Sequence, residues 1–312
     1  MKKYYPEGQL INTVENCTAI KSELVLQEAM TQGQILEARA VICDNNHNLI
    51  VDIPAMKGII PREEGALGIR EGVTRDIALI SKVNKPVCFK ITTITKDENG
   101  NPIAFLSRRK AQEECLEAYL STLASGDIIP ARVTHLEQFG AFVDIGCGIP
   151  SLIPIDAISV SRISHPADRF HVGQDIKVIV KSNQSASAAD SGKIWLSHKE
   201  LLGTWEENAA LFHAGETVAG IVRSIESYGV FIELTPNLAG LAEPRENVYI
   251  GQHASVYIKA LIPEKMKVKL IIVDVFDASY SVPDIRYFCN DGHISSWIYT
   301  PDGSDKLIES HF

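Results

Sequence analysis

The sequence lacks a long hydrophobic run, a paired-cysteine motif and an apolar leader. No stretch reaches the roughly 18 apolar residues that read as a membrane span, so none is expected. The six cysteines stand singly, without a C-x-x-C pair, which argues against structural zinc and a disulfide framework. The first residues contain no apolar segment typical of a secretory signal. We therefore expect a cytoplasmic protein with reduced thiols and no membrane partner.

Signatures of catalysis are also missing. The chain contains no G-x-x-x-x-G-K-[ST], G-x-G-x-x-G, G-x-S-x-G or H-E-x-x-H motif. Its nine histidines do not cluster at the spacing of metal ligands. These absences do not exclude an enzyme, but no residue pattern recommends one. We predict no catalytic residue, no metal and no cofactor.

Charge argues against indiscriminate binding to a polyanion. The formal net charge is −9, and the acidic excess lies mostly in the segments between and after the repeats described below. The repeats themselves are close to neutral. A near-neutral domain can bind a single-stranded nucleic acid by stacking, with little electrostatic help.

A repeated phrase determines the predicted architecture. Residues 138–145 (QFGAFVDI) recur at 227–234 (SYGVFIEL), and residues 48–53 (NLIVDI) form a weaker third copy. Repetition of this kind indicates tandem supersecondary units. Short β-branched strands bounded by Gly, Pro, Asp and Asn follow each start and predict a small barrel. The fold class is therefore mainly β, with three tandem five-stranded OB-fold barrels joined by short helices and followed by a small C-terminal appendage.

Segments between the repeats show helical or hairpin patterns. Apolar residues at 3–4 spacing predict one helix over 108–123 and a second over 198–212, with another over 14–30. The aromatic C-terminal segment is expected to form a hairpin through 301–303 that packs on the last barrel. The predicted domains are an N-terminal helical segment 1–31, a degenerate repeat 32–108, a helical linker 109–124, a repeat 125–199, a helical linker 200–213, a repeat 214–274 and an appendage 275–312.

Aromatic residues in the repeated phrase suggest a binding surface. Strand alternation places Phe142 on one face with Asp144, and Phe231 with Glu233. Because a carboxylate favours solvent, we expect both rings to be exposed beside Phe139 and Tyr228. Exposed rings on a barrel suit base stacking, which is worth roughly 1–3 kcal/mol per base. The alternative is that the rings pack under a neighbouring loop or helix.

Basic residues at matched places are candidate phosphate ligands. Lys181 aligns with Lys259, and Lys193 aligns with Lys267. Arg132 and Arg223 lie near the ends of the first strands of their repeats. Each of the six is equally well explained as a solvated surface charge.

The second repeat resembles a known module, the S-one RNA-binding domain, an OB-fold repeat of the bacterial small ribosomal subunit. The similarity lies in residues 139–146 (FGAFVDIG), 152–155 (LIPI), 173–175 (GQD) and 192–197 (GKIWLS). The third repeat is less similar and the first less again. The junctions at 106–109 (LSRR) and 196–199 (LSHK) also resemble those of the multi-repeat ribosomal protein. Pro61, Pro154 and Glu243 stand where the family often has a histidine.

The resemblance implies non-catalytic binding of single-stranded RNA, with Phe139, Phe142, Tyr228 and Phe231 on the stacking positions. Lys193 and Lys267 fall near the basic position of the family's last strand. The ribosome and mRNA are candidate partners, and translation or RNA metabolism is the expected setting. The alternative, favoured by the near-neutral repeats and by Glu243, is a protein-interaction scaffold with little RNA affinity.

Overall fold

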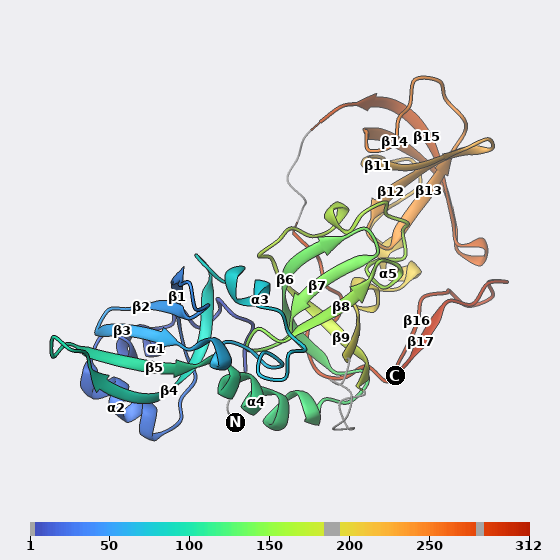
Figure 1. Ribbon diagram of the computed structural model, residues 1–312. Coiled ribbons are helices and arrows are strands. Elements are labelled where there is room, and N and C mark those ends of the chain that lie inside the picture. Colours follow the sequence, from blue (N-terminus) through green and yellow to red (C-terminus); the bar gives the residue numbers. More distant parts are fainter. Residues whose placement is uncertain (1–3, 184–193, 279–283) are drawn as a thin grey trace. The chain divides into compact units, whose positions relative to one another are not determined.

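Three small β-barrels form most of the protein in its computed structural model, which describes residues 4–183, 194–278 and 284–312 (Figure 1). Each barrel has five strands and closes on itself, as predicted. In each one the chain follows the same circular order: first, second, third, fifth and fourth strand. The third and fifth strands run parallel in each barrel. The other neighbouring strands of barrels 1 and 3 are antiparallel, as are β9 and β10 of barrel 2. This is the topology of an OB fold.

The strands of the first barrel, barrel 1, are β1 (Leu36–Cys43), β2 (Leu49–Ile53), β3 (Met56–Ile60), β4 (Pro86–Lys96) and β5 (Pro102–Ser107). Barrel 2 consists of β6 (Ile128–Glu137), β7 (Gly140–Asp144), β8 (Pro150–Pro154), β9 (Asp175–Asn183) and β10 (Ile194–Ser197). Barrel 3 consists of β11 (Thr217–Glu226), β12 (Gly229–Thr235), β13 (Leu238–Ala242), β14 (His253–Ile262) and β15 (Lys267–Phe276).

The barrel interiors are formed by one face of each strand. In β7 the side chains of Ala141 and Val143 are fully buried, whereas Phe142 between them is half-buried. In β15 the buried Val268, Leu270 and Ile272 alternate with exposed residues. This period of two is what a closed sheet requires, because successive side chains point to opposite faces. The β-branched and leucine residues of the repeats therefore form the cores.

The connecting helices are shorter than predicted. The helix expected over 108–123 is α4 (Arg108–Ala118), followed by the 3₁₀ turn η2 (Leu120–Thr122). The single helix expected over 198–212 is wrong: η5 (Lys199–Leu202) and α5 (Trp205–Ala209) are separated by Gly203, whose φ is +83°. A left-handed residue cannot continue a right-handed helix. The N-terminal helix is likewise two helices, α1 (Val14–Ala19) and α2 (Glu23–Thr31).

Short helical elements also lie between the strands. They are η1 (Arg62–Glu64) and α3 (Ile77–Ile80) in barrel 1, η3 (Ile155–Ala157) and η4 (Pro166–Asp168) in barrel 2, and η6 (Pro263–Lys265) in barrel 3. Of these, η4 contributes to the ion network described below. No helix among the described residues is long and apolar enough to cross a membrane.

The C-terminal segment forms the predicted hairpin. Strand β16 (Ser296–Ile298) pairs antiparallel with β17 (Glu309–His311). Trp297 and Tyr299 are buried in the hydrophobic cluster of barrel 3. Upstream, Ile294 donates its backbone N–H to the carbonyl of Gly126 at 2.9 Å, so the segment also adds an isolated bridge to barrel 2.

The chain divides into two compact units, each described by itself below. The first comprises Met1–Leu123, Pro130–Arg132 and Asp144–Pro150. The second comprises Ala124–Ile129, Val133–Val143 and Ser151–Phe312. Barrel 1 lies in the first unit, and barrel 3 lies in the second with most of barrel 2.

Candidate nucleic-acid interface

The four predicted rings form two matching pairs. Phe139, in the turn before β7, meets Phe142 edge to face, with ring centroids 5.9 Å apart and planes at 89°. Tyr228, in the turn before β12, meets Phe231 at 6.1 Å and 89°. In each pair the turn residue is open to solvent, with 56% of Phe139 and 64% of Tyr228 exposed. The strand residues Phe142 and Phe231 are half-buried rather than freely exposed.

The reasoning from the carboxylates was wrong. Asp144 and Glu233 are buried, so they do not mark a solvent-facing side. Asp144 accepts backbone N–H groups from Glu7 at 2.7 Å, Gly146 at 2.8 Å and Gly148 at 3.0 Å. Burial, and next the nearby charge of Glu7, raises the pKa of Asp144 to about 6. A carboxylate can be buried when hydrogen bonds replace water, which strand alternation does not reveal.

Glu233 is buried for a different reason, because two arginines neutralise it. Arg169, which follows η4, forms an ion pair with the Glu233 carboxylate, and both side chains are 6% exposed. Arg223 Nε donates to Glu233 Oε2 at 2.8 Å, and Arg223 Nη1 lies 3.1 Å from Asp168 Oδ1. The guanidinium of Arg223 is therefore occupied by two carboxylates and is largely buried. This placement does not favour the phosphate contact predicted for it.

Three of the four predicted lysines lie on the outside. Lys181, Lys259 and Lys267 are exposed, whereas Lys193 lies outside the described residues. Lys181 and Lys259 occupy one place in the two barrels, since each is the extra residue where the fourth strand shifts its pairing with the fifth. A bulge of this kind re-aims its side chain.

Arg132 differs from the lysines. It is half-buried in β6, and its Nη1 donates to the carbonyl oxygen of Glu7 at 3.3 Å. That contact belongs to the first unit, not to the surface of the ring pairs. Like Arg223, Arg132 is therefore less available to a ligand than the three exposed lysines.

Trp195 and Lys269 lie on the same outward surface and were not predicted from the sequence. In barrel 3, Phe231 pairs with Leu241 on β13, and Leu241 pairs with Lys269 on β15. In barrel 2, Leu152 on β8 pairs with Trp195 on β10. Trp195 is 37% exposed, between two buried aliphatic residues. The alternation Ile194-Trp195-Leu196 was a visible signal, because it places the indole opposite two core residues.

Barrel 1 offers a different surface at the equivalent positions. There Ile50 pairs with Ile59, which pairs with Phe105. His47 stands at the turn position with a φ of +61°, and Thr92 replaces the bulge lysine. Ile42, the partner of Ile50 on β1, is 55% exposed. This surface is aliphatic except for Phe105, and it lacks the ring pairs of the other two barrels.

The sequence of barrel 2 is similar to a known protein family. Residues 122–185 match the S1 RNA binding domain family. Barrel 2 resembles an S1 domain. The matched range contains all of β6, β7, β8 and β9, together with Phe139 and Phe142, and ends before β10. Barrels 1 and 3 lie outside the matched range and share its strand order.

Over most of its length the chain is similar to ribosomal proteins. The chain is 29% identical over 268 residues to the small ribosomal subunit protein bS1 of Staphylococcus aureus, covering 81% of this chain and 64% of that protein. It is 28% identical over 298 residues to a bS1 homolog of Bacillus cereus, covering 90% of this chain and 74% of that one. The chain thus spans less than two thirds of the length of the Staphylococcus relatives.

One solved structure aligns with a large part of the chain. A crystal structure of a multidomain protein with nucleic acid binding domains from Streptococcus pneumoniae aligns with 78% of this chain and 74% of that one. The sequence identity is 14% and the TM-score 0.25. A score at this level supports no conclusion about the arrangement of the barrels.

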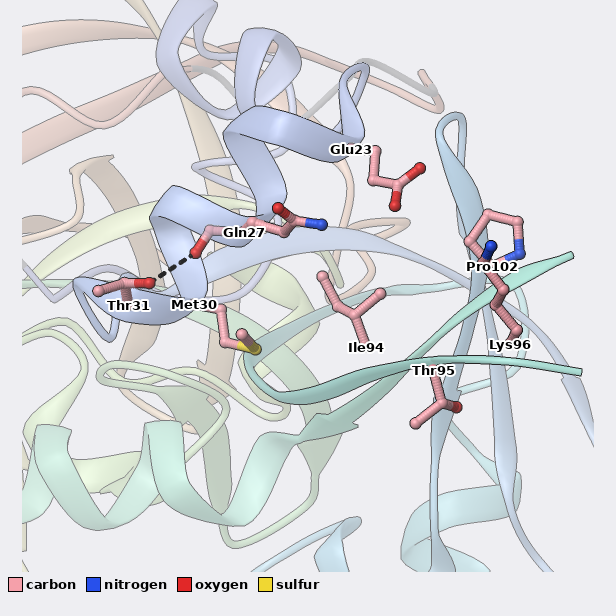
Figure 2. A pocket seen from close by; sticks show the side chains of 8 residues that line it. All are labelled: Glu23, Gln27, Met30, Thr31, Ile94, Thr95, Lys96 and Pro102. Carbon is pink, nitrogen blue, oxygen red and sulfur yellow. Dashed lines mark hydrogen bonds between the residues drawn. The ribbon is translucent and has the colours of Figure 1, made fainter.

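A pocket outside the matched range is found in barrel 1. It lies between α2 and the β4–β5 hairpin of barrel 1, and Figure 2 shows Glu23 and Gln27 on one side and Ile94 and Lys96 on the other. Its dashed contact is the Thr31 hydroxyl donating to the carbonyl of Gln27, within α2. Among the described residues, no three His, Cys, Asp or Glu side chains are placed to hold a metal ion.

Proposed function

We propose that the chain binds single-stranded RNA on the outward faces of barrels 2 and 3 and catalyses no reaction. The observation that supports this most directly is the repeated pair of rings, one half-buried in a strand and one open to solvent. A ring fixed by an edge-to-face neighbour presents its face to a ligand at little further cost in side-chain entropy. Unstacked bases supply the complementary faces, at roughly 1–3 kcal/mol per base.

Phosphate contacts would add to stacking. Lys181, Lys259 and Lys267 are exposed on the same two barrels, and Lys193 belongs to the same predicted set. Each phosphate neutralised by a lysine makes affinity fall with salt. The rings recognise any base through its π face, so sequence selectivity should be low.

The cellular setting follows from the relatives. Their names place them in the small ribosomal subunit. We propose that this chain acts in the cytoplasm in translation, with mRNA or the ribosome as partner.

Fluorescence anisotropy with a labelled unstructured oligoribonucleotide tests the proposal. The wild type should bind, and binding should weaken as salt rises. Changing Phe142 and Phe231 together to alanine should weaken binding by about five- to 150-fold for each ring that contacts a base. The matched control is Ile50→Ala in barrel 1, which truncates the equivalent strand residue where no ring pair stands.

The outcomes separate clearly. Unchanged affinity in the Phe142→Ala, Phe231→Ala double variant would remove the platform. Loss of affinity in Ile50→Ala of the same size would show that general destabilisation, rather than lost stacking, explains the result. Circular dichroism of each variant establishes that the barrels remain folded.

A second candidate function applies to barrel 1. Its outward row of Ile42, Ile50 and Ile59 suits a protein surface better than a base. In this reading barrel 1 is an interaction module while the other barrels bind RNA. Ile50→Glu should then reduce co-sedimentation with purified small ribosomal subunits and leave oligoribonucleotide affinity unchanged. Loss of neither property would refute the interaction module.

A further inference from the structure

The outward rows of barrels 2 and 3 begin alike and end differently. Barrel 3 has the continuous row Phe231, Leu241, Lys269 across β12, β13 and β15. In barrel 2 the pair Leu152 and Trp195 occupies β8 and β10. The third member is therefore an indole in one barrel and an ammonium group in the other.

The rows are equivalent because the strands pack alike. A Cβ added to Gly140 would lie 2.4 Å from the carbonyl oxygen of Ile153 and 3.1 Å from Leu152 Cδ1. A Cβ added to Gly229 would meet the carbonyl oxygen of Ala242 at 2.5 Å and Leu241 Cδ1 at 2.7 Å. The second and third strands thus approach each other in the same way in both barrels. Strands β7 and β10 flank β8, so the strands that carry Phe142 and Trp195 are about two spacings of ~4.8 Å apart.

In each barrel a bulged lysine on the fourth strand lies next to the last residue of the row. In barrel 2 the fourth strand pairs Val180 with the buried Leu196 and Ser182 with Trp195, which leaves Lys181 as the bulged residue. In barrel 3 the same shift leaves Lys259 as the bulged residue, next to the pair that contains Lys269. Both bulge lysines are exposed. Among the residues that the structure describes, the row of barrel 2 therefore ends in a ring beside the cation Lys181, and that of barrel 3 ends in the two cations Lys259 and Lys269.

We propose that Trp195 is a third stacking position of barrel 2, whereas Lys269, its counterpart in barrel 3, binds backbone phosphate. This inference rests on the proposed RNA binding. It assigns base stacking to the end of the row in barrel 2 and phosphate binding to the end of the row in barrel 3. Barrel 2 contributes stacking energy that depends weakly on salt. Barrel 3 contributes the steeper salt dependence.

Exposure of the indole supports this assignment. The chain has three tryptophans; Trp205 and Trp297 are 3% and 7% exposed, against 37% for Trp195. A large aromatic side chain that stays open to water on a strand flanked by core residues leaves apolar area uncovered. The half-buried Leu152, its partner on β8, continues the apolar surface from Trp195 toward the ring pair.

The same difference in exposure makes the test selective. Intrinsic tryptophan fluorescence is recorded while unlabelled oligouridylate is added to the full chain. A base stacking on Trp195 should quench its emission, whereas the two buried indoles should change little. Trp195→Phe should abolish the quenching and retain most of the affinity. Trp195→Ala should weaken binding by about five- to 150-fold without changing its salt slope.

Exchanging Trp195 and Lys269 tests whether barrel 2 stacks on bases while barrel 3 binds phosphate at this position. Lys269→Ala should reduce the slope of log affinity against log salt by about 0.7, the value for one phosphate contact on a single strand. Trp195→Lys should increase that slope by a similar amount, and Lys269→Trp should introduce new quenching. The matched control is Phe276→Ala, which removes an exposed ring seven residues beyond Lys269 on β15.

The outcomes distinguish this inference from the proposed function. Binding by the wild type with no quenching and with unchanged affinity in Trp195→Ala would overturn the third stacking position and leave RNA binding standing. A loss of affinity in Phe276→Ala equal to that in Trp195→Ala would overturn it as well. No binding by the wild type at low salt would overturn both.

Discussion

Replacing Glu233 by glutamine tests the buried ion network of barrel 3. The Glu233 carboxylate faces the guanidinium groups of Arg169 and Arg223, and all three side chains are at most 10% exposed. The substitution keeps the shape of the side chain and removes its charge. Two buried cations then share Asp168, which lies 3.1 Å from Arg223. Breaking a buried pair in this way costs about 3–5 kcal/mol, because the remaining charge is left without compensation.

The assay is thermal and urea unfolding of the full chain. A folding unit of 150–250 residues shifts its midpoint by about 2–4 °C for each kcal/mol, so the loss predicts a decrease of roughly 6–20 °C in the transition of the second unit. The control is Asp52→Asn, since Asp52 occupies the equivalent strand position in barrel 1 but is exposed. It should change stability by no more than about 0.5 kcal/mol.

The reasoning would be refuted if Glu233→Gln unfolded at the wild-type midpoint. It would also fail if Asp52→Asn were equally destabilising, because position in the repeat rather than burial of charge would then determine the cost. Oligoribonucleotide affinity of the folded Glu233→Gln protein should remain near that of the wild type, since this network is not part of the ring pairs.

Three other perturbations have defined outcomes. Burial lowers the pKa of His198 from 6.5 to about 4, so the unfolded chain binds this proton more readily than the folded chain. The free energy of unfolding should therefore decrease as pH falls from 6.5 to 4, by at most about 1.4 kcal/mol per pH unit. His198→Gln should flatten this dependence in urea titrations at several pH values. Gly126 has a φ of +93°, and an added Cβ would lie 2.2 Å from the carbonyl oxygen of Ile294, so Gly126→Ala should loosen the C-terminal segment and accelerate its limited proteolysis; an unchanged cleavage rate would contradict the contact. Lys259→Ala and Lys267→Ala should each reduce the salt slope of RNA binding by about 0.7, and unchanged slopes would assign both to solvent.

The repeat and its strand periodicity predicted the barrels because both are local properties. Alternating apolar residues define an inward face whatever the surroundings, and the repeated phrase indicated the same unit more than once. The helix over 198–212 failed for an equally local reason, since the left-handed backbone of Gly203 separates η5 from α5. The ring pairs were also found from the sequence, because both members lie within four residues of each other.

Long-range partners explain what the sequence did not reveal. Asp144 and Glu233 follow the same pattern as solvent-facing carboxylates, and only contacts with residues such as Glu7 and Arg169 make their burial possible. Arg223 looks like a free phosphate ligand until Glu233 and Asp168 are placed beside it. Trp195 becomes part of the surface only when β10 pairs with β8, which brings together residues more than 40 positions apart.

By itself the sequence determined the number of barrels, their inward faces and the aromatic turn between the first two strands of barrels 2 and 3, because these depend on neighbours along the chain. The tertiary structure decided which charges are buried in pairs, which remain free for a ligand and which side chains complete the outward rows. Those properties depend on groups that meet only after folding, and burial of an ion is tolerated only where a distant partner offsets the loss of water.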